Sequence, residues 1–65
     1  MKMWIAYNPV DDTTEAFTEK PTWWGSHKSW WPVNGRYLGI LKKNYPGLTF
    51  SEGPIEVELS MEDVL

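Results

Sequence analysis

Along residues 2–8, Met3, Ile5 and Tyr7 alternate with Lys2, Trp4 and Ala6, so the two sets would lie on opposite faces of an extended segment. Residues 8–13 contain Asn, Pro and two Asp, a composition typical of a turn. Residues 14–20 contain Thr and Phe, which favour a return strand, and Pro21 would end it. The N-terminal part of the chain therefore predicts a β-hairpin.

The clearest strand pattern lies in residues 55–60, where Ile, Val and Leu alternate with Glu56 and Glu58. This spacing places both glutamates on one face. The simplest interpretation is a solvated acidic face, and the alternative is a face that steers a basic partner surface. Residues 60–65 begin with Ser60 and carry two acids, so this tail fits either a short capped helix or a frayed end.

Proline and glycine interrupt the middle of the chain so often that a long helix has no room there. Asn34-Gly35 predicts a tight turn, and residues 36–41 a strand after it. Residues 41–47 fit one helical turn or an irregular loop, and residues 48–50 are expected to form a short strand. The pattern predicts an all-β or β-rich fold. We expect residues 1–65 to form a single small domain, an antiparallel sheet of four to five short strands with room for one short helical turn.

Four of the five tryptophans lie within nine residues, in the pairs Trp23-Trp24 and Trp30-Trp31. The polar segment between the pairs predicts a second hairpin or a wide loop. Adjacent residues of a strand point to opposite faces, so both members of a pair cannot enter one core. We expect one ring of each pair to stabilise the sheet and the other to contact a sister subunit or a ligand.

The small size of the chain limits how it can be stabilised. A 65-residue chain is near the lower limit for independent folding. With no cysteine it has no disulfide or thiolate metal site, and the single histidine, His27, cannot anchor a zinc ion alone. We therefore predict no metal and no cofactor. Two sources of stability remain, which are large buried aromatic side chains and burial against a second copy of the chain. We therefore expect a homo-oligomer.

Charge is segregated along the chain, although the net charge is only −3. Residues 20–51 carry five basic residues and no acid, whereas the two flanks are acidic. Two interpretations stay open: acidic strands that pair beside the basic centre, and an electropositive aromatic patch. The negative net charge argues against binding to long nucleic acid, whose phosphates repel an acidic protein. No signal sequence or membrane-spanning run is evident, so we expect a cytoplasmic protein with no membrane partner.

Several residues are candidates for contact with a partner or ligand. His27 fits a solvated loop, or contact with a phosphate or a partner carboxylate, but not a general base, because no residue nearby would orient it. The paired lysines fit a solvated turn. Together, the indole rings and the cations match what a nucleobase and its phosphates need. The candidate residues are Trp23, Trp24, His27, Lys28, Trp30, Trp31, Arg36, Lys42 and Lys43.

The order of short motifs resembles small uncharacterised proteins encoded by bacteriophages and by prophage regions of gut bacteria. The resemblance is carried by Trp4-Ile5-Ala6, by Phe17–Pro21, by the Trp-rich middle, by Tyr45–Phe50 and by Glu52–Leu59. The doubled Trp pairs and the acidic tail depart from that pattern. The resemblance concerns the scaffold and implies no activity, but it favours a phage accessory role in the host cytosol.

These observations favour a non-catalytic, phage-type binding protein. We expect it to antagonise a host process, such as host defence, either by capturing a nucleotide-like ligand or by blocking a host protein. For the contacts we single out Trp24, Lys28, Trp30 and Arg36. The alternative is a structural or assembly protein whose tryptophan cluster forms a homo-oligomer interface.

Overall fold

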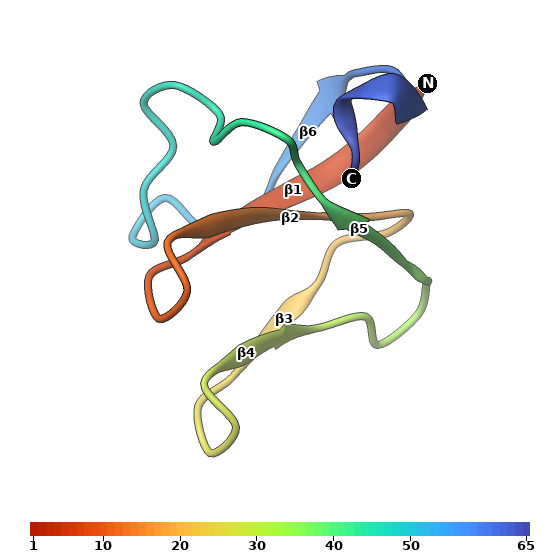
Figure 1. Cartoon of the computed structure of the whole chain (residues 1–65). Coiled ribbons are helices and arrows are strands. Elements are labelled where there is room, and N and C mark those ends of the chain that lie inside the picture. Colours follow the sequence, from red (N-terminus) through yellow and green to blue (C-terminus); the bar gives the residue numbers. More distant parts are fainter.

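Six short strands and one 3-10 turn make up the protein in a computed structural model, which describes residues 1–65 (Figure 1). The main sheet is antiparallel, in the order β5-β2-β1-β6, and β3 and β4 form a separate two-stranded sheet. The β-rich fold class is confirmed, but the strands divide between two sheets. The elements are β1 (Lys2–Asn8), β2 (Thr13–Phe17), β3 (Thr22–Trp24), β4 (Ser29–Trp31), β5 (Tyr37–Ile40), β6 (Ile55–Glu58) and the 3-10 turn η1 (Met61–Asp63).

One face of the main sheet carries the larger hydrophobic core. Met3 and Ile5 of β1 and Ala16 of β2 are fully buried there. The long connection after β5 and the C-terminal segment cover this face, contributing Leu41, Leu48 and Val64. The alternation of residues 2–8 predicted this inward face of β1, because strand side chains repeat with a period of two.

The opposite face of the sheet is covered by the β3–β4 hairpin. Ala6, Phe17 and Trp30 form a second buried cluster, against which Trp4 and Trp23 pack. The Nε1–H of Trp30 donates a hydrogen bond of 2.9 Å to the carbonyl oxygen of Tyr7 in β1. Because β1 is covered on both faces, its alternation of apolar and polar residues is incomplete.

The C-terminal segment also closes one edge of the main sheet. The amide of Leu65 donates to the carbonyl of Ile40 at 2.7 Å, and the amide of Lys42 donates to the carbonyl of Asp63 at 2.8 Å. An isolated antiparallel bridge joins Leu41 to Val64 between these two bonds. The edge next to β5 is therefore paired, whereas β6 forms the other edge and pairs only with β1.

Local structure differs from the sequence-based predictions in the second half of the chain. Residues 48–50 form no strand, because Leu48 turns into the core and Phe50 into the tryptophans. Residues 41–47 form the irregular loop rather than a helical turn. The tail adopts the short helix: Ser60 caps η1 through a reciprocal capping box with Asp63.

Candidate binding site on the β3–β4 hairpin

The register of the β3–β4 hairpin fixes where its four tryptophans point. Trp23 lies opposite Trp30, Thr22 opposite Trp31, and Trp24 opposite Ser29. Because strand side chains alternate, Trp23 and Trp30 share the inner face of the hairpin, and Trp24 and Trp31 share the outer face. The predicted division of each pair between two faces is confirmed.

The inner face attaches the hairpin to the rest of the protein. Trp23 and Trp30 meet edge to face with ring centroids 5.3 Å apart, and Phe50 packs against Trp23 at 4.7 Å. Trp30 is only 8% exposed, and its indole N–H donates a hydrogen bond to the carbonyl oxygen of Tyr7. Trp30, one of the expected contact residues, therefore anchors the hairpin and has little surface to offer a partner.

The outer face of the hairpin presents the most exposed indole rings of the protein. Trp24 is 42% exposed and Trp31 is 49% exposed. The two rings stand nearly perpendicular, with centroids 5.0 Å apart and an interplanar angle of 86°. His27 packs against Trp24 with centroids 4.2 Å apart. We call Trp24, His27 and Trp31 the outer aromatic face.

The turn at the tip of the hairpin is closed by its own backbone. The amide of His27 donates to the carbonyl of Trp24 at 3.1 Å, and the amide of Lys28 donates to that of Gly25 at 3.3 Å. Lys28 closes the turn in the left-handed region, with φ of 51°. Its side chain is exposed and makes no ion pair.

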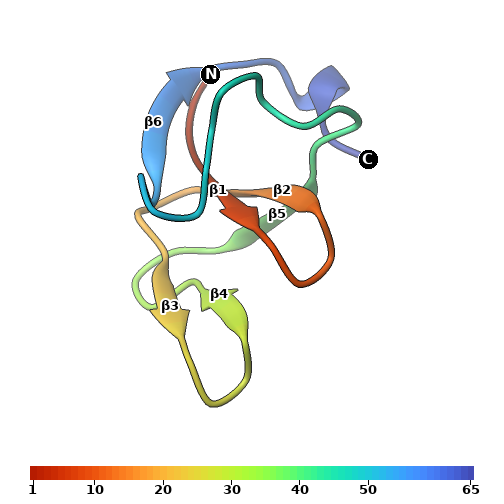
Figure 2. The same cartoon turned by 90° about the vertical axis from the view of Figure 1, so that its left-hand side faces the viewer.

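The basic residues do not gather around the tryptophans. Arg36 lies beyond the open end of the hairpin, where its amide donates a hydrogen bond to Thr18 Oγ1 and its carbonyl oxygen accepts one from the Thr18 amide. The loop of residues 41–47, which carries Lys42 and Lys43, and the β3–β4 hairpin cover opposite faces of the main sheet (Figures 1 and 2). A single nucleobase-and-phosphate site built from all these residues is therefore not assembled.

The basic side chains of residues 20–51 form no ion pair with the acidic flanks. The only ion pair joins the N-terminal amino group to Glu58 at 2.6 Å. In the main sheet, β1 pairs with β2 and β6, which all come from the flanks, and β2 also pairs with β5 of the central segment. An acidic flank therefore does lie beside the central segment, as one of the two interpretations expected, but no ion pair joins the two.

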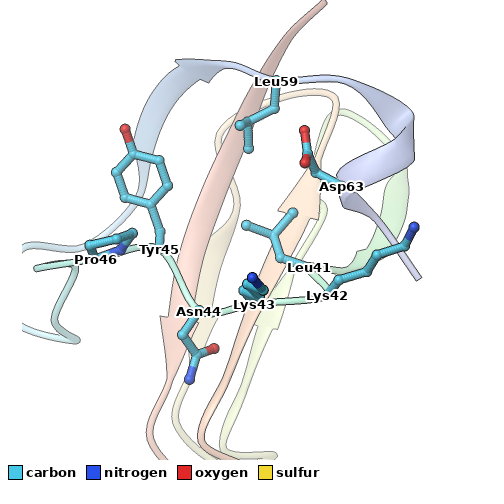
Figure 3. A pocket seen from close by; sticks show the side chains of 8 residues that line it. All are labelled: Leu41, Lys42, Lys43, Asn44, Tyr45, Pro46, Leu59 and Asp63. Carbon is cyan, nitrogen blue, oxygen red and sulfur yellow. The ribbon is translucent and has the colours of Figure 1, made fainter.

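Lys42 and Lys43 instead line a hollow of about 390 Å³ that the sequence did not indicate. Figure 3 shows Leu41 and Leu59 pointing toward each other across its floor, with Tyr45 at one side. The walls come from the loop after β5 and from the segment around η1. No local pattern could reveal this hollow, because its two sides meet only through tertiary contacts.

Three side chains have a raised pKa, and none of them adjoins His27. Burial raises the pKa of the Glu15 carboxyl, and burial likewise raises the pKa of Tyr37. The hydroxyl of Tyr7 donates to Asp12 Oδ1 at 2.6 Å, and this hydrogen bond raises the pKa of Tyr7. Each shift favours the neutral form of the group.

No three His, Asp or Glu side chains come together in a way that could hold a metal ion.

No helix of this protein has the length and apolar character that crossing a bilayer requires. The chain matches no protein-family model, no curated protein and no solved structure. The resemblance to phage-encoded proteins stays an expectation that rests on its short motifs.

Proposed function

We propose that this protein is a non-catalytic binding module that captures a partner protein with the outer aromatic face of its β3–β4 hairpin. The observation that carries the proposal is the pair of exposed indoles, Trp24 and Trp31, side by side on one face. Tryptophan is enriched among the residues that dominate the energy of protein interfaces.

The way the hairpin is held supports this role. Trp23 and Trp30 pack beneath the outer face, and Trp30 is hydrogen-bonded to β1. The exposed rings therefore belong to a supported hairpin that projects from the main sheet (Figure 2). Preorganised aromatic side chains lose little conformational entropy on binding, which improves affinity for a given contact area.

A protein partner fits this face better than a nucleotide-like ligand. Trp24 and Trp31 stand at an angle of 86°, so they cannot close on the two faces of one base. Lys28 is the one cation next to these rings by sequence, and Arg36 lies beyond the open end of the hairpin. Perpendicular indoles instead form an apolar step that can enter a hydrophobic recess of a protein. In the setting implied by the phage resemblance, the partner would be a host protein whose activity is blocked.

The alternative function, self-assembly, uses the same surface. The outer aromatic face could bury itself against a second copy of the chain, since exposed indoles favour homo-oligomer interfaces too. The two functions predict different complexes. Capture predicts a complex with a foreign partner, whereas self-assembly predicts a complex of copies of this chain alone.

The test compares the wild type with Trp24→Ser/Trp31→Ser. Immobilised protein captures partners from a bacterial lysate, and the affinity of each purified partner is then measured. We expect the double substitution to weaken binding by at least about 30-fold, because an interface tryptophan that dominates binding contributes roughly 2 kcal/mol or more. Val10→Ser is the matched control, because it removes an equally exposed apolar side chain, 59% exposed, from the turn between β1 and β2.

Sedimentation of the same proteins separates the alternatives. A wild-type dimer that the double substitution converts to monomer, with no foreign partner captured, would establish self-assembly instead. Partners that bind both variants equally well would refute the proposed site. A thermal shift with AMP or ATP that Lys28→Gly abolishes would restore the nucleotide hypothesis, because glycine preserves the left-handed turn while removing the charge.

A further inference from the structure

One edge of the main sheet is paired with another segment of the chain, and the other edge is not. The edge next to β5 is closed by the C-terminal segment, through the backbone bonds at Ile40 and Lys42. The opposite edge, β6, pairs with β1 on one side and with no other strand on the second side. An unpaired edge strand presents backbone groups that can hydrogen-bond to another chain.

The register shows which backbone groups of β6 face outward. Met1 and Leu59 exchange two bonds: the Leu59 amide donates to the Met1 carbonyl at 3.0 Å, and the Met1 amino group donates to the Leu59 carbonyl at 2.7 Å. In an antiparallel pair, bonded and non-bonded residue pairs alternate. Val57 therefore also faces β1, and the amides and carbonyls of Glu56 and Glu58 point away from the sheet.

The side chains of β6 indicate what can pair with this edge. Glu56 and Glu58 are exposed, Val57 is half-buried, and the register against β1 is continuous from Glu58 to Ile55. The strand has none of the proline, lysine or β-bulge devices that normally protect a sheet edge. Only its acidic side chains oppose pairing with another chain, and their charge repels an acidic strand but not a basic one.

We propose that the β6 edge accepts an extended, basic segment of a partner protein as a fifth strand of the main sheet. The outward amides and carbonyls of Glu56 and Glu58 hydrogen-bond to the incoming backbone. The Glu56 carboxylate attracts lysine or arginine beside it, whereas that of Glu58 is already paired with the N-terminal amino group. A second copy of this chain is disfavoured, because two β6 strands would place four carboxylates side by side. This surface is distinct from the outer aromatic face, so the inference does not depend on the proposed function.

The test uses a synthetic peptide of alternating lysine and valine as the probe. At physiological ionic strength, we expect it to shift the NMR amide signals of Glu56 and Glu58 while leaving those of Leu65 and Lys42 unchanged. A peptide of the same sequence that is N-methylated at every residue keeps the charge but has no backbone N–H to donate from either edge, so its binding should be lost. If it binds as tightly as the parent peptide, charge alone explains the contact and the inference fails.

Two variants test the strand itself. Glu56→Pro removes an outward amide without removing a bond to β1, and proline is tolerated at such edge positions. We expect it to weaken peptide binding by about tenfold or more, which corresponds to one lost hydrogen bond and one lost charge. Glu56→Lys/Glu58→Lys keeps the backbone groups and should reverse the preference, toward a peptide of alternating glutamate and valine.

Undiminished binding of the lysine peptide to both variants would overturn the assignment. So would a wild-type dimer that Glu56→Pro dissociates, because the occupant of the edge would then be a second copy. Trp24→Ser/Trp31→Ser should bind the peptide as the wild type does, which keeps this result separate from that of the hairpin site.

Discussion

Trp30 and Trp31 are neighbours in the sequence, yet 8% of the first and 49% of the second is exposed. The difference arises from the alternation of a strand combined with one anchoring bond, from the Trp30 indole to the Tyr7 carbonyl. Phenylalanine at either position keeps an aromatic ring but removes the indole N–H. The pair therefore allows one substitution to be compared at two adjacent positions.

We expect Trp30→Phe to lower the free energy of unfolding by about 2 kcal/mol or more, because it leaves a cavity and an unpaired carbonyl oxygen. Trp31→Phe, the matched control, should cost less than about 1 kcal/mol, since it affects an exposed ring. Urea denaturation followed by circular dichroism measures both. Equal losses at the two positions would contradict the assignment of inner and outer faces.

At the scale of elements, the C-terminal segment and β5 depend on a close approach at Gly39. Gly39 has φ of 140°, a backbone conformation that residues with a side chain rarely adopt. A Cβ there would lie 2.6 Å from Val64 Cγ1 and 3.3 Å from the carbonyl oxygen of Leu65. This glycine lets the C-terminal segment lie against β5, and so it keeps that edge of the sheet closed.

Gly39→Ala should therefore release the C-terminal segment and destabilise the protein by about 2 kcal/mol or more, from backbone strain and overlap with a stiff valine. Hydrogen exchange should show lost protection at the amides of Leu65 and Lys42. Gly25→Ala is the control, because a Cβ there meets no atom within 4 Å. Unchanged protection in Gly39→Ala would show that the segment is held by other contacts.

At the scale of the whole molecule, the two proposed interaction surfaces lie on different sheets: the outer aromatic face on the β3–β4 hairpin and the acidic edge at β6 of the main sheet. The main sheet also holds a partly buried carboxyl, Glu15 in β2, whose pKa is raised by burial. A raised pKa in the folded state stabilises the fold fully below the pKa of the unfolded chain. That contribution is lost as the pH rises through the pKa of the folded state.

Glu15→Gln should raise the midpoint of thermal unfolding by a few degrees at neutral pH, because it removes a carboxylate that burial disfavours. Near pH 3 the variant and the wild type should unfold together, since the carboxyl is then protonated in both states of the wild type. Thermal melts across this pH range measure the difference. Glu56→Gln, at an exposed position, is the control, and a gain for Glu15→Gln that grew toward acid pH would contradict the explanation.

The sequence predicted the features that depend on neighbouring residues. The alternation in residues 2–8 and 55–60 predicted β1 and β6. The doubled tryptophans predicted a hairpin or a wide loop, with the two rings of each pair on opposite faces, and the hairpin is what forms. For the tail, Ser60 and the acids after it left a short capped helix and a frayed end open, and the structure shows the capped 3-10 turn. These features were predictable because strand periodicity and capping are properties of a short stretch of backbone.

The tertiary structure alone decided which face of the hairpin would be buried. Trp30 turned inward and Trp31 outward because Ala6, Phe17 and the Tyr7 carbonyl lie on that side of the main sheet, more than twenty positions away for Ala6 and Tyr7. The same long-range pairing dispersed the basic residues, formed the hollow beside Lys42 and Lys43, and closed one sheet edge while leaving β6 open. A local pattern specifies that two faces or two edges exist, but only packing between distant segments determines which of them remains exposed.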